Sequence, residues 1–169
     1  GLAVANADRD LAKIAVVERH KATGNVGLGF IKGFGIKRGA IASSVAHDAH
    51  NVICVGITDR DMEAAIRKVS DSEGGVVVVI DGEVRAALPL PVGGLMSDRP
   101  LDEVTTMVRE LQRVASETGC SHPDPVTALS FLALPVIPSL KLTDPPSSKS
   151  AGTSEGSPGS GERLSQADG

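Results

Sequence analysis

The segment Val76-Val-Val-Val-Ile80, followed directly by Asp81-Gly82, constrains the fold of this chain more than any other feature. Five consecutive apolar, β-branched residues predict a strand that is buried on both faces. Both residues of the Asp-Gly pair tolerate a positive φ, so this pair predicts a two-residue turn. Residues 83–88 then return antiparallel to the first strand, and the chain contains a β-sheet with at least one hairpin.

Three further runs rich in β-branched residues predict strands over 13–19, 40–46 and 52–58. The run over 126–134 is compatible with either a strand or a short helix. Because these strands do not alternate regularly with helices, we expect an α/β fold of the α+β type. Its architecture is a mixed β-sheet with two or three packed helices.

Two helices are expected between and after these strands. The first begins at Thr58 or Asp59, either of which can cap it, and Gly74-Gly75 supplies its left-handed stop. The second begins just after Pro100, carries an apolar stripe at helical spacing and ends before Gly119.

The composition changes sharply after Asp144. Of the 25 residues from 145 to 169, 15 are Ser, Gly or Pro, which do not build a hydrophobic core. We therefore expect one folded domain over residues 1–144 and a disordered tail over residues 145–169. A chain of 169 residues is long enough for one such domain and its core.

Aromatic residues are nearly absent, and this narrows the classes of partner. The chain has three Phe and neither Trp nor Tyr, so we expect no stacking platform for exposed bases and no nucleic-acid partner. No stretch is long and apolar enough to span a membrane, and no basic-then-apolar leader opens the sequence. These observations predict a cytoplasmic protein with no membrane partner.

The residues between Glu18 and Asp48 form a basic, glycine-rich window. This window has no acidic residue, six glycines and five cations, which are Arg19, Lys21, Lys32, Lys37 and Arg38. Glycine lets backbone N–H groups converge on an anion, and the cations would complement it. The spacing matches neither the dinucleotide fingerprint nor the phosphate-binding loop, so a structural role in a twisted sheet stays open.

The densest polar cluster, His47-Asp48-Ala49-His50-Asn51, lies between two predicted strands. Two imidazoles beside a carboxylate can ligate a metal, relay a proton or bind the edge of a purine. A metal site needs three or four protein ligands, and no further set is spaced to complete one, so we expect neither metal nor cofactor bound by this chain. His47, Asp48, His50 and Asn51 are the candidate site residues, with a hydrogen-bonded turn as the alternative.

Other chemistry-bearing side chains stand alone in the sequence. His20 and His122 are interpreted as incidental. Cys54 and Cys120 fit no metal-binding spacing and no disulfide framework, so they are interpreted as a buried apolar residue and an incidental thiol.

Several segments together resemble the C-terminal domain of bacterial adenine deaminase. They occur in order over about residues 10–144: Val17-Glu18-Arg19-His20, 23–29, Gly33-Phe34-Gly35, 38–51, Leu88-Pro89-Leu90-Pro91, Gly94-Leu95-Met96-Ser97, 129–138 and 140–144. So many linked motifs make the resemblance specific. Ala49 stands where Ser is commoner in that family, and after Asp144 the family normally closes with a short apolar end, whereas this chain continues into the Ser- and Gly-rich tract.

The resemblance implies a function for this chain. Adenine deaminases belong to the amidohydrolase superfamily and hydrolyse adenine to hypoxanthine and ammonia in purine metabolism, with manganese or iron held in a (β/α)₈ barrel. That barrel would precede the present domain, so the chain would be a fragment of a homo-oligomeric, cytoplasmic enzyme and inactive alone. The resemblance also implies that His47, Asp48, His50 and Asn51 face the active-site mouth of that barrel.

Two alternatives stay open. A free-standing anion- or nucleotide-binding module would use the glycine-rich window. A non-catalytic remnant would instead expose the apolar surface that the barrel otherwise covers.

Overall fold

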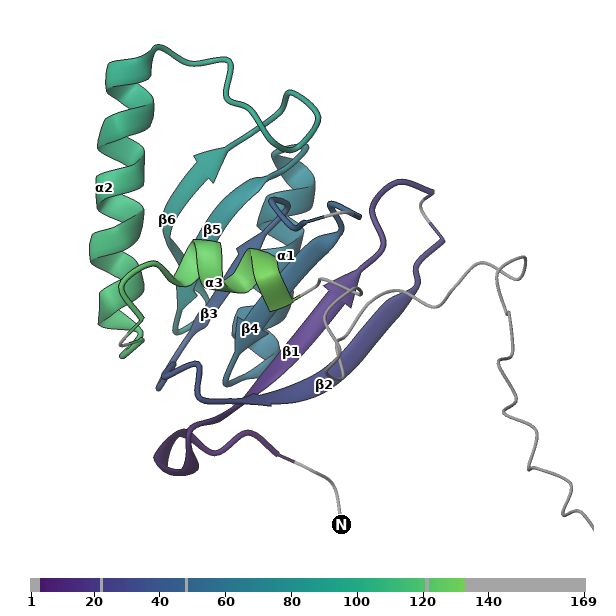
Figure 1. Ribbon diagram of the computed structural model, residues 1–169, viewed down its shortest axis with the longest axis vertical. Coiled ribbons are helices and arrows are strands. Elements are labelled where there is room, and N and C mark those ends of the chain that lie inside the picture. Colours follow the sequence, from purple (N-terminus) through teal and green to yellow (C-terminus); the bar gives the residue numbers. More distant parts are fainter. Residues whose placement is uncertain (1–3, 22, 48, 121, 133–169) are drawn as a thin grey trace, which may run out of the picture.

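The computed structural model describes residues 4–21, 23–47, 49–120 and 122–132 (Figure 1). A short 3₁₀ helix, η1 (Ala7–Arg9), precedes the first strand. Six strands and three α-helices follow in the described part: β1 (Leu11–Val17), β2 (Val26–Lys32), β3 (Ala40–Ser43), β4 (Val52–Gly56), α1 (Asp59–Asp71), β5 (Gly75–Ile80), β6 (Glu83–Pro89), α2 (Leu101–Glu117) and α3 (Pro125–Leu132).

The strands form one sheet in the order β2-β1-β4-β3-β5-β6. The α+β class is therefore confirmed, but the sheet differs from the mixed one expected, because all its neighbouring strands are antiparallel. The crossover through α1 joins β4 to β5, and these two strands do run parallel. They are separated by β3, which lies between them and pairs antiparallel with both.

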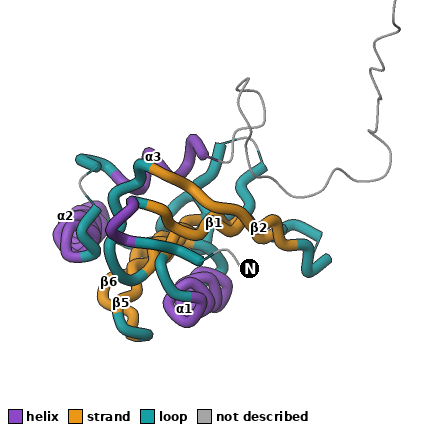
Figure 2. Tube along the Cα trace, turned by 90° about the horizontal axis from the view of Figure 1, so that it is seen from below, coloured by secondary structure: helices purple, strands orange, loops and turns teal. Residues whose placement is uncertain are grey.

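One helix, α1, packs on one face of the sheet, and residues of α2 and α3 contribute to the core on the other face. Figure 2 shows α1 on one face and α3 on the other, with α2 beside β6. Under α1 the core consists mainly of small residues: Ala15, Ala40, Ala42, Val52, Cys54, Met62, Ala65, Val69, Val77 and Val79. On the opposite face, larger side chains such as Ile41, Ile53 and Ile80 belong to one core with Leu111 of α2 and Leu129 of α3.

The local signals for the hairpin turn and for the start of α1 are confirmed, and the one for the end of α1 is off by one residue. Asp81 and Gly82 both have positive φ, of 57° and 81°, and join β5 to β6 as a hairpin. Thr58 is the N-cap of α1, since its side chain accepts a hydrogen bond from the backbone of Asp61. The left-handed residue after α1 is Glu73, with φ of 57°, one position before the Gly74-Gly75 pair that was expected to supply it.

The sequence left one strand unpredicted and one run undecided, and part of its expectations concerns residues that the structure does not describe. The glycine-rich window between Glu18 and Asp48 contains β2, a strand that the sequence does not single out because its alternate residues Gly27 and Gly29 have low β-propensity. The undecided run over 126–134 is helical as far as Leu132. Residues 133 and 134 and the whole tail over 145–169 lie outside the described residues.

Candidate functional site

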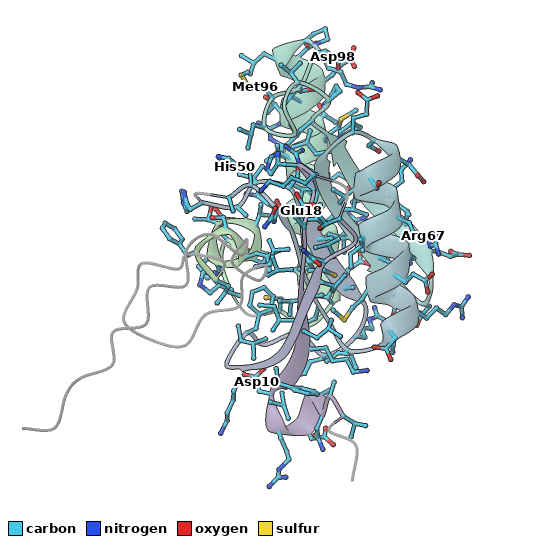
Figure 3. The ribbon with its side chains drawn as sticks, turned by 90° about the vertical axis from the view of Figure 1, so that its right-hand side faces the viewer. Asp10, Glu18, His50, Arg67, Met96 and Asp98 are labelled. Carbon is cyan, nitrogen blue, oxygen red and sulfur yellow. The ribbon has the colours of Figure 1, made fainter. Side chains whose placement is uncertain are left out.

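Three loops lie together at one end of the sheet. They are the described residues of the turn after β1 (18–21 and 23–25), of the loop between β3 and β4 (44–47 and 49–51) and of the loop after β6 (90–97). Figure 3 shows Glu18, His50 and Met96 toward this end and Asp10 at the opposite end. We call this region the loop end.

Ser44 joins the loop end to the sheet. Its hydroxyl accepts a hydrogen bond from the Gly75 N–H (2.8 Å) and donates one to the Gly94 carbonyl (2.6 Å). Its own N–H donates to the Gly75 carbonyl at 3.0 Å, and the side chain is fully buried. One serine thus fixes the β3–β4 loop, the start of β5 and the loop after β6 relative to one another.

Arg19 makes a second connection across the loop end. Its Nη2 donates to the carbonyl oxygen of Gly93 at 2.5 Å. The guanidinium also packs against Gly94, because a Cβ built there would lie only 1.6 Å from Arg19 Nη1. The absence of a side chain at Gly94 is what lets the cation from the end of β1 reach the loop after β6.

His20 makes a third connection and is not incidental, contrary to the sequence interpretation. Its Nε2 lies 2.7 Å from the carbonyl oxygen of Ala49, in the middle of the candidate loop. Because a carbonyl only accepts, Nε2 carries the proton in this contact. The turn after β1 therefore holds the loop that contains His47 and His50.

The candidate residues of that loop have different environments. His47 is exposed, and its ring centroid lies 4.5 Å from that of Phe131. Its backbone N–H donates to the Ser130 carbonyl. His50 is partly buried in the left-handed region, with φ of 48°, and Asn51 is 2% exposed. Asp48 lies outside the described residues.

One atom of His50 is unusual. Its Nδ1 is buried and has no hydrogen-bond partner in the described part of the chain. Buried polar atoms are nearly always hydrogen-bonded, and an unpaired one costs free energy. A buried, unpaired imidazole nitrogen beside an exposed loop is therefore a group that a ligand or a neighbouring domain can satisfy.

Glu18 orders the turn after β1. Its carboxylate accepts hydrogen bonds from the backbone N–H groups of Lys21 (2.6 Å) and Thr23 (3.1 Å) and from the Thr23 hydroxyl. Desolvation of the carboxyl raises its pKa, but these hydrogen bonds together outweigh it and hold the pKa of Glu18 below its ordinary value. The turn that positions Arg19 and His20 is thus built around an ionised carboxylate.

A pocket of about 580 Å³ opens at the loop end on the α1 side of the sheet. Its wall includes Glu18, Arg19 and His20 from the turn after β1, Gly74 after α1 and Gly93 from the loop after β6. Its volume is in the range of small-molecule sites. His47 and His50 lie outside its wall, so the pocket and the candidate loop are neighbouring parts of the loop end.

Comparison with known proteins assigns the chain to a family. The model of the family described as adenine deaminase C-terminal domain matches residues 1–145. The chain belongs to this family.

Its similarity to whole adenine deaminases is high but partial. The chain is 53% identical to the adenine deaminase of Desulfatibacillum aliphaticivorans over 144 residues, which are 85% of this chain and 25% of that relative. It is 52% identical to the adenine deaminase of Archaeoglobus fulgidus over 137 residues, 81% of this chain and 24% of that one. This adenine deaminase C-terminal domain therefore spans about a quarter of the length of these relatives.

The described part of the domain has neither a cluster of metal ligands nor a membrane-spanning helix. Within residues 4–21, 23–47, 49–120 and 122–132, no group of three or more His, Cys, Asp or Glu side chains is placed to hold a metal ion. The donor set of these residues thus does not fit manganese or iron. No helix among the same residues is long and apolar enough to cross a membrane.

Several residues of the glycine-rich window have hydrogen-bond partners within the domain. The Gly35 N–H donates to the Asp10 carboxylate at 2.8 Å. Lys37 Nζ donates to a carbonyl of η1, and Arg38 Nε donates to the Glu117 carbonyl at the end of α2. These contacts favour the structural interpretation of the window over the nucleotide-binding alternative.

Proposed function

We propose that this domain is the C-terminal part of an adenine deaminase, a hydrolase that converts adenine and water to hypoxanthine and ammonia. Its relatives carry that name, and they are about four times as long as the region they share with this chain. In this proposal the loop end faces the active site, which lies in the preceding part of the complete enzyme. The isolated chain is then inactive.

One observation carries the proposal, namely the convergence of separate motifs at the loop end. Segments 17–20, 38–51, 88–91 and 94–97 are four of those that resemble the family, and they come from three distant parts of the sequence. Hydrogen bonds from Arg19, His20 and Ser44 join them to one another at this end. Binding residues on loops that a rigid scaffold holds together are typical of functional sites.

Within the loop end, we assign the contact with the rest of the enzyme to His47 and His50. The exposed ring of His47 can reach a neighbouring domain, and the buried, unpaired Nδ1 of His50 can be satisfied there or by a ring nitrogen or amino group of adenine. An imidazole has one nitrogen that can donate a hydrogen bond and one that can accept, so it suits proton transfer to and from a purine. Asp48 and Asn51 belong to the same loop and the same proposed contact.

The proposed metal, partner domain and substrate follow from the resemblance of this chain to enzymes of the amidohydrolase superfamily. Manganese or iron would be held by the barrel of the complete enzyme and would activate the attacking water there. The partner of this domain is then that barrel, and adenine is the substrate of the whole. Cys54 and Cys120 are both free thiols, which supports a reducing compartment such as the cytoplasm.

The histidine assignment is tested in a chimaera. Residues 1–144 of this chain replace the C-terminal quarter of the adenine deaminase of Desulfatibacillum aliphaticivorans, and hypoxanthine formation is measured with manganese supplied. We expect His50→Asn to lower kcat/KM at least about tenfold, with an unchanged melting temperature. Asparagine is chosen because it tolerates the positive φ at this position better than alanine does.

The matched control is His122→Asn, an exposed histidine of the loop before α3. It should leave kcat/KM unchanged. If His50→Asn and His47→Ala both keep full activity, the loop is a structural turn and the assignment is wrong. If His50→Asn lowers the melting temperature and the activity together, the histidine stabilises the fold instead.

A further inference from the structure

The edge strand β2 carries a row of exposed apolar side chains. Val26, Leu28 and Phe30 alternate along the strand and are 48%, 74% and 42% exposed. The row lies on the α1 face of the sheet, because Leu28 pairs with Ala15, which belongs to the core under α1. The helix α1 itself packs on β3, β4 and β5, so β2 extends beyond it (Figures 1 and 2).

The row stands as a ridge beside α1. Pockets of about 390 and 350 Å³ separate it from the helix. One is lined by Leu28, Phe30 and Met62, and the other by Val26, Leu28 and Ile66. The apolar side chains of β2 are therefore not covered by the helix of their own domain.

The two edges of the sheet differ in how well they are protected from pairing with another chain, and this difference indicates that β2 is the edge that pairs. The β6 edge has exposed charges at Glu83 and Arg85, a proline at its end and an irregular register against β5. These are the features that protect natural sheet edges from pairing with another chain. From Val26 to Ile31, β2 has neither charge nor proline, and within the described residues it pairs with β1 alone.

We propose that β2 pairs antiparallel with β2 of a second copy of this chain, about a two-fold axis through Leu28. Leu28 then faces Leu28 of the second copy, and Val26 faces Phe30, so a smaller side chain meets a larger one. The strand's single charge, on Lys32, falls opposite Gly24. Shifting the axis to Gly29 would place Lys32 opposite Val26, so charge and size both favour the axis at Leu28.

This pairing satisfies the open backbone edge of β2 and joins the two apolar rows. A two-fold axis perpendicular to the sheet keeps α1 of both copies on the same side. The rows of the two copies then form one continuous apolar strip between the two α1 helices. The inference concerns assembly alone, and it does not depend on the activity proposed above.

A cysteine at the axis tests the pairing directly. Directly opposite residues of an antiparallel pair have Cα atoms about 4.5–5.5 Å apart, which a disulfide can span. Under mild oxidation the 169-residue chain with Leu28→Cys should become a covalent dimer. Val84→Cys, at an exposed position of the other edge, should stay uncrosslinked, and the native Cys54 and Cys120 are buried.

Sedimentation equilibrium over a concentration series gives the second readout. We expect a reversible dimer of the 169-residue chain, with a dissociation constant that Leu28→Lys raises at least about tenfold, because like charges then face each other. Val84→Lys should leave the constant unchanged. A chain that stays monomeric up to roughly millimolar concentration overturns the proposal. So does a dimer that Leu28→Cys does not crosslink or that Leu28→Lys does not weaken.

Discussion

The hydroxyl of Ser44 lies 2.6 Å from the carbonyl oxygen of Gly94, fifty residues further along the chain. The hydroxyl oxygen of Ser44 also accepts a hydrogen bond from the N–H of Gly75 at the start of β5. The loop after β6 is thereby fixed to the middle of the sheet by a single buried side chain. The geometry of the loop end therefore depends on residues that touch neither His47 nor His50.

Replacing Ser44 by alanine should destabilise the domain and loosen the loop after β6. The change leaves the Gly75 N–H and the Gly94 carbonyl without their buried partner, which costs about 1–3 kcal/mol. Urea unfolding followed by circular dichroism measures the loss. Ser70→Ala, at an exposed position of α1, is the control and should change the free energy of unfolding by less than about 0.5 kcal/mol. Equal values for the two variants would show that Ser44 does not hold the loop.

Gly94→Ala should cost more stability than Gly93→Ala. Both glycines have positive φ, where a Cβ costs about 1–2 kcal/mol. At Gly93 nothing lies within 4 Å of the added Cβ, whereas at Gly94 it would collide with the guanidinium of Arg19. The difference between the two variants, measured by urea unfolding, should shrink when Arg19 is also replaced by alanine. A difference that persists without Arg19 would mean that the collision is not its cause.

Glu18 should make stability depend on acid pH. Its folded-state pKa is lowered from the ordinary value of 4.5, so the unfolded chain binds a proton more readily than the folded one. The stabilisation is fully present above that ordinary value and is lost as the pH falls through the lower folded-state pKa. Urea unfolding between pH 7 and pH 3 should therefore show a smaller acid loss for Glu18→Gln than for the parent chain. An identical acid loss in the two proteins would contradict the role given to this carboxylate.

Short-range signals predicted much of this fold. The five-residue apolar run, the Asp81-Gly82 turn and the Thr58 cap act over a few neighbouring residues, and the structure confirms all three. The strand β2 was not predicted, because Gly27 and Gly29 lower its β-propensity and its place is set by pairing with β1. The left-handed residue after α1 was misplaced by one position, onto Gly74 instead of Glu73.

The candidate site was harder to predict, because its contacts join distant segments. The sequence indicated the loop of His47 and His50, and the structure locates it at the loop end. No local sequence pattern indicated that His20 would contact Ala49, 29 residues away, or that Asp10 would accept the N–H of Gly35. Such contacts are determined by strand order and register, which the residues around each partner do not specify.

The most direct test of the central claim is hypoxanthine formation from adenine by three proteins. They are the adenine deaminase of Desulfatibacillum aliphaticivorans without its C-terminal quarter, the chimaera that carries residues 1–144 of this chain in that place, and this chain alone. We expect activity from the chimaera only, because the loop end completes an active site that lies elsewhere in the enzyme. Full activity of the truncated enzyme, or activity of this chain alone, would contradict the account.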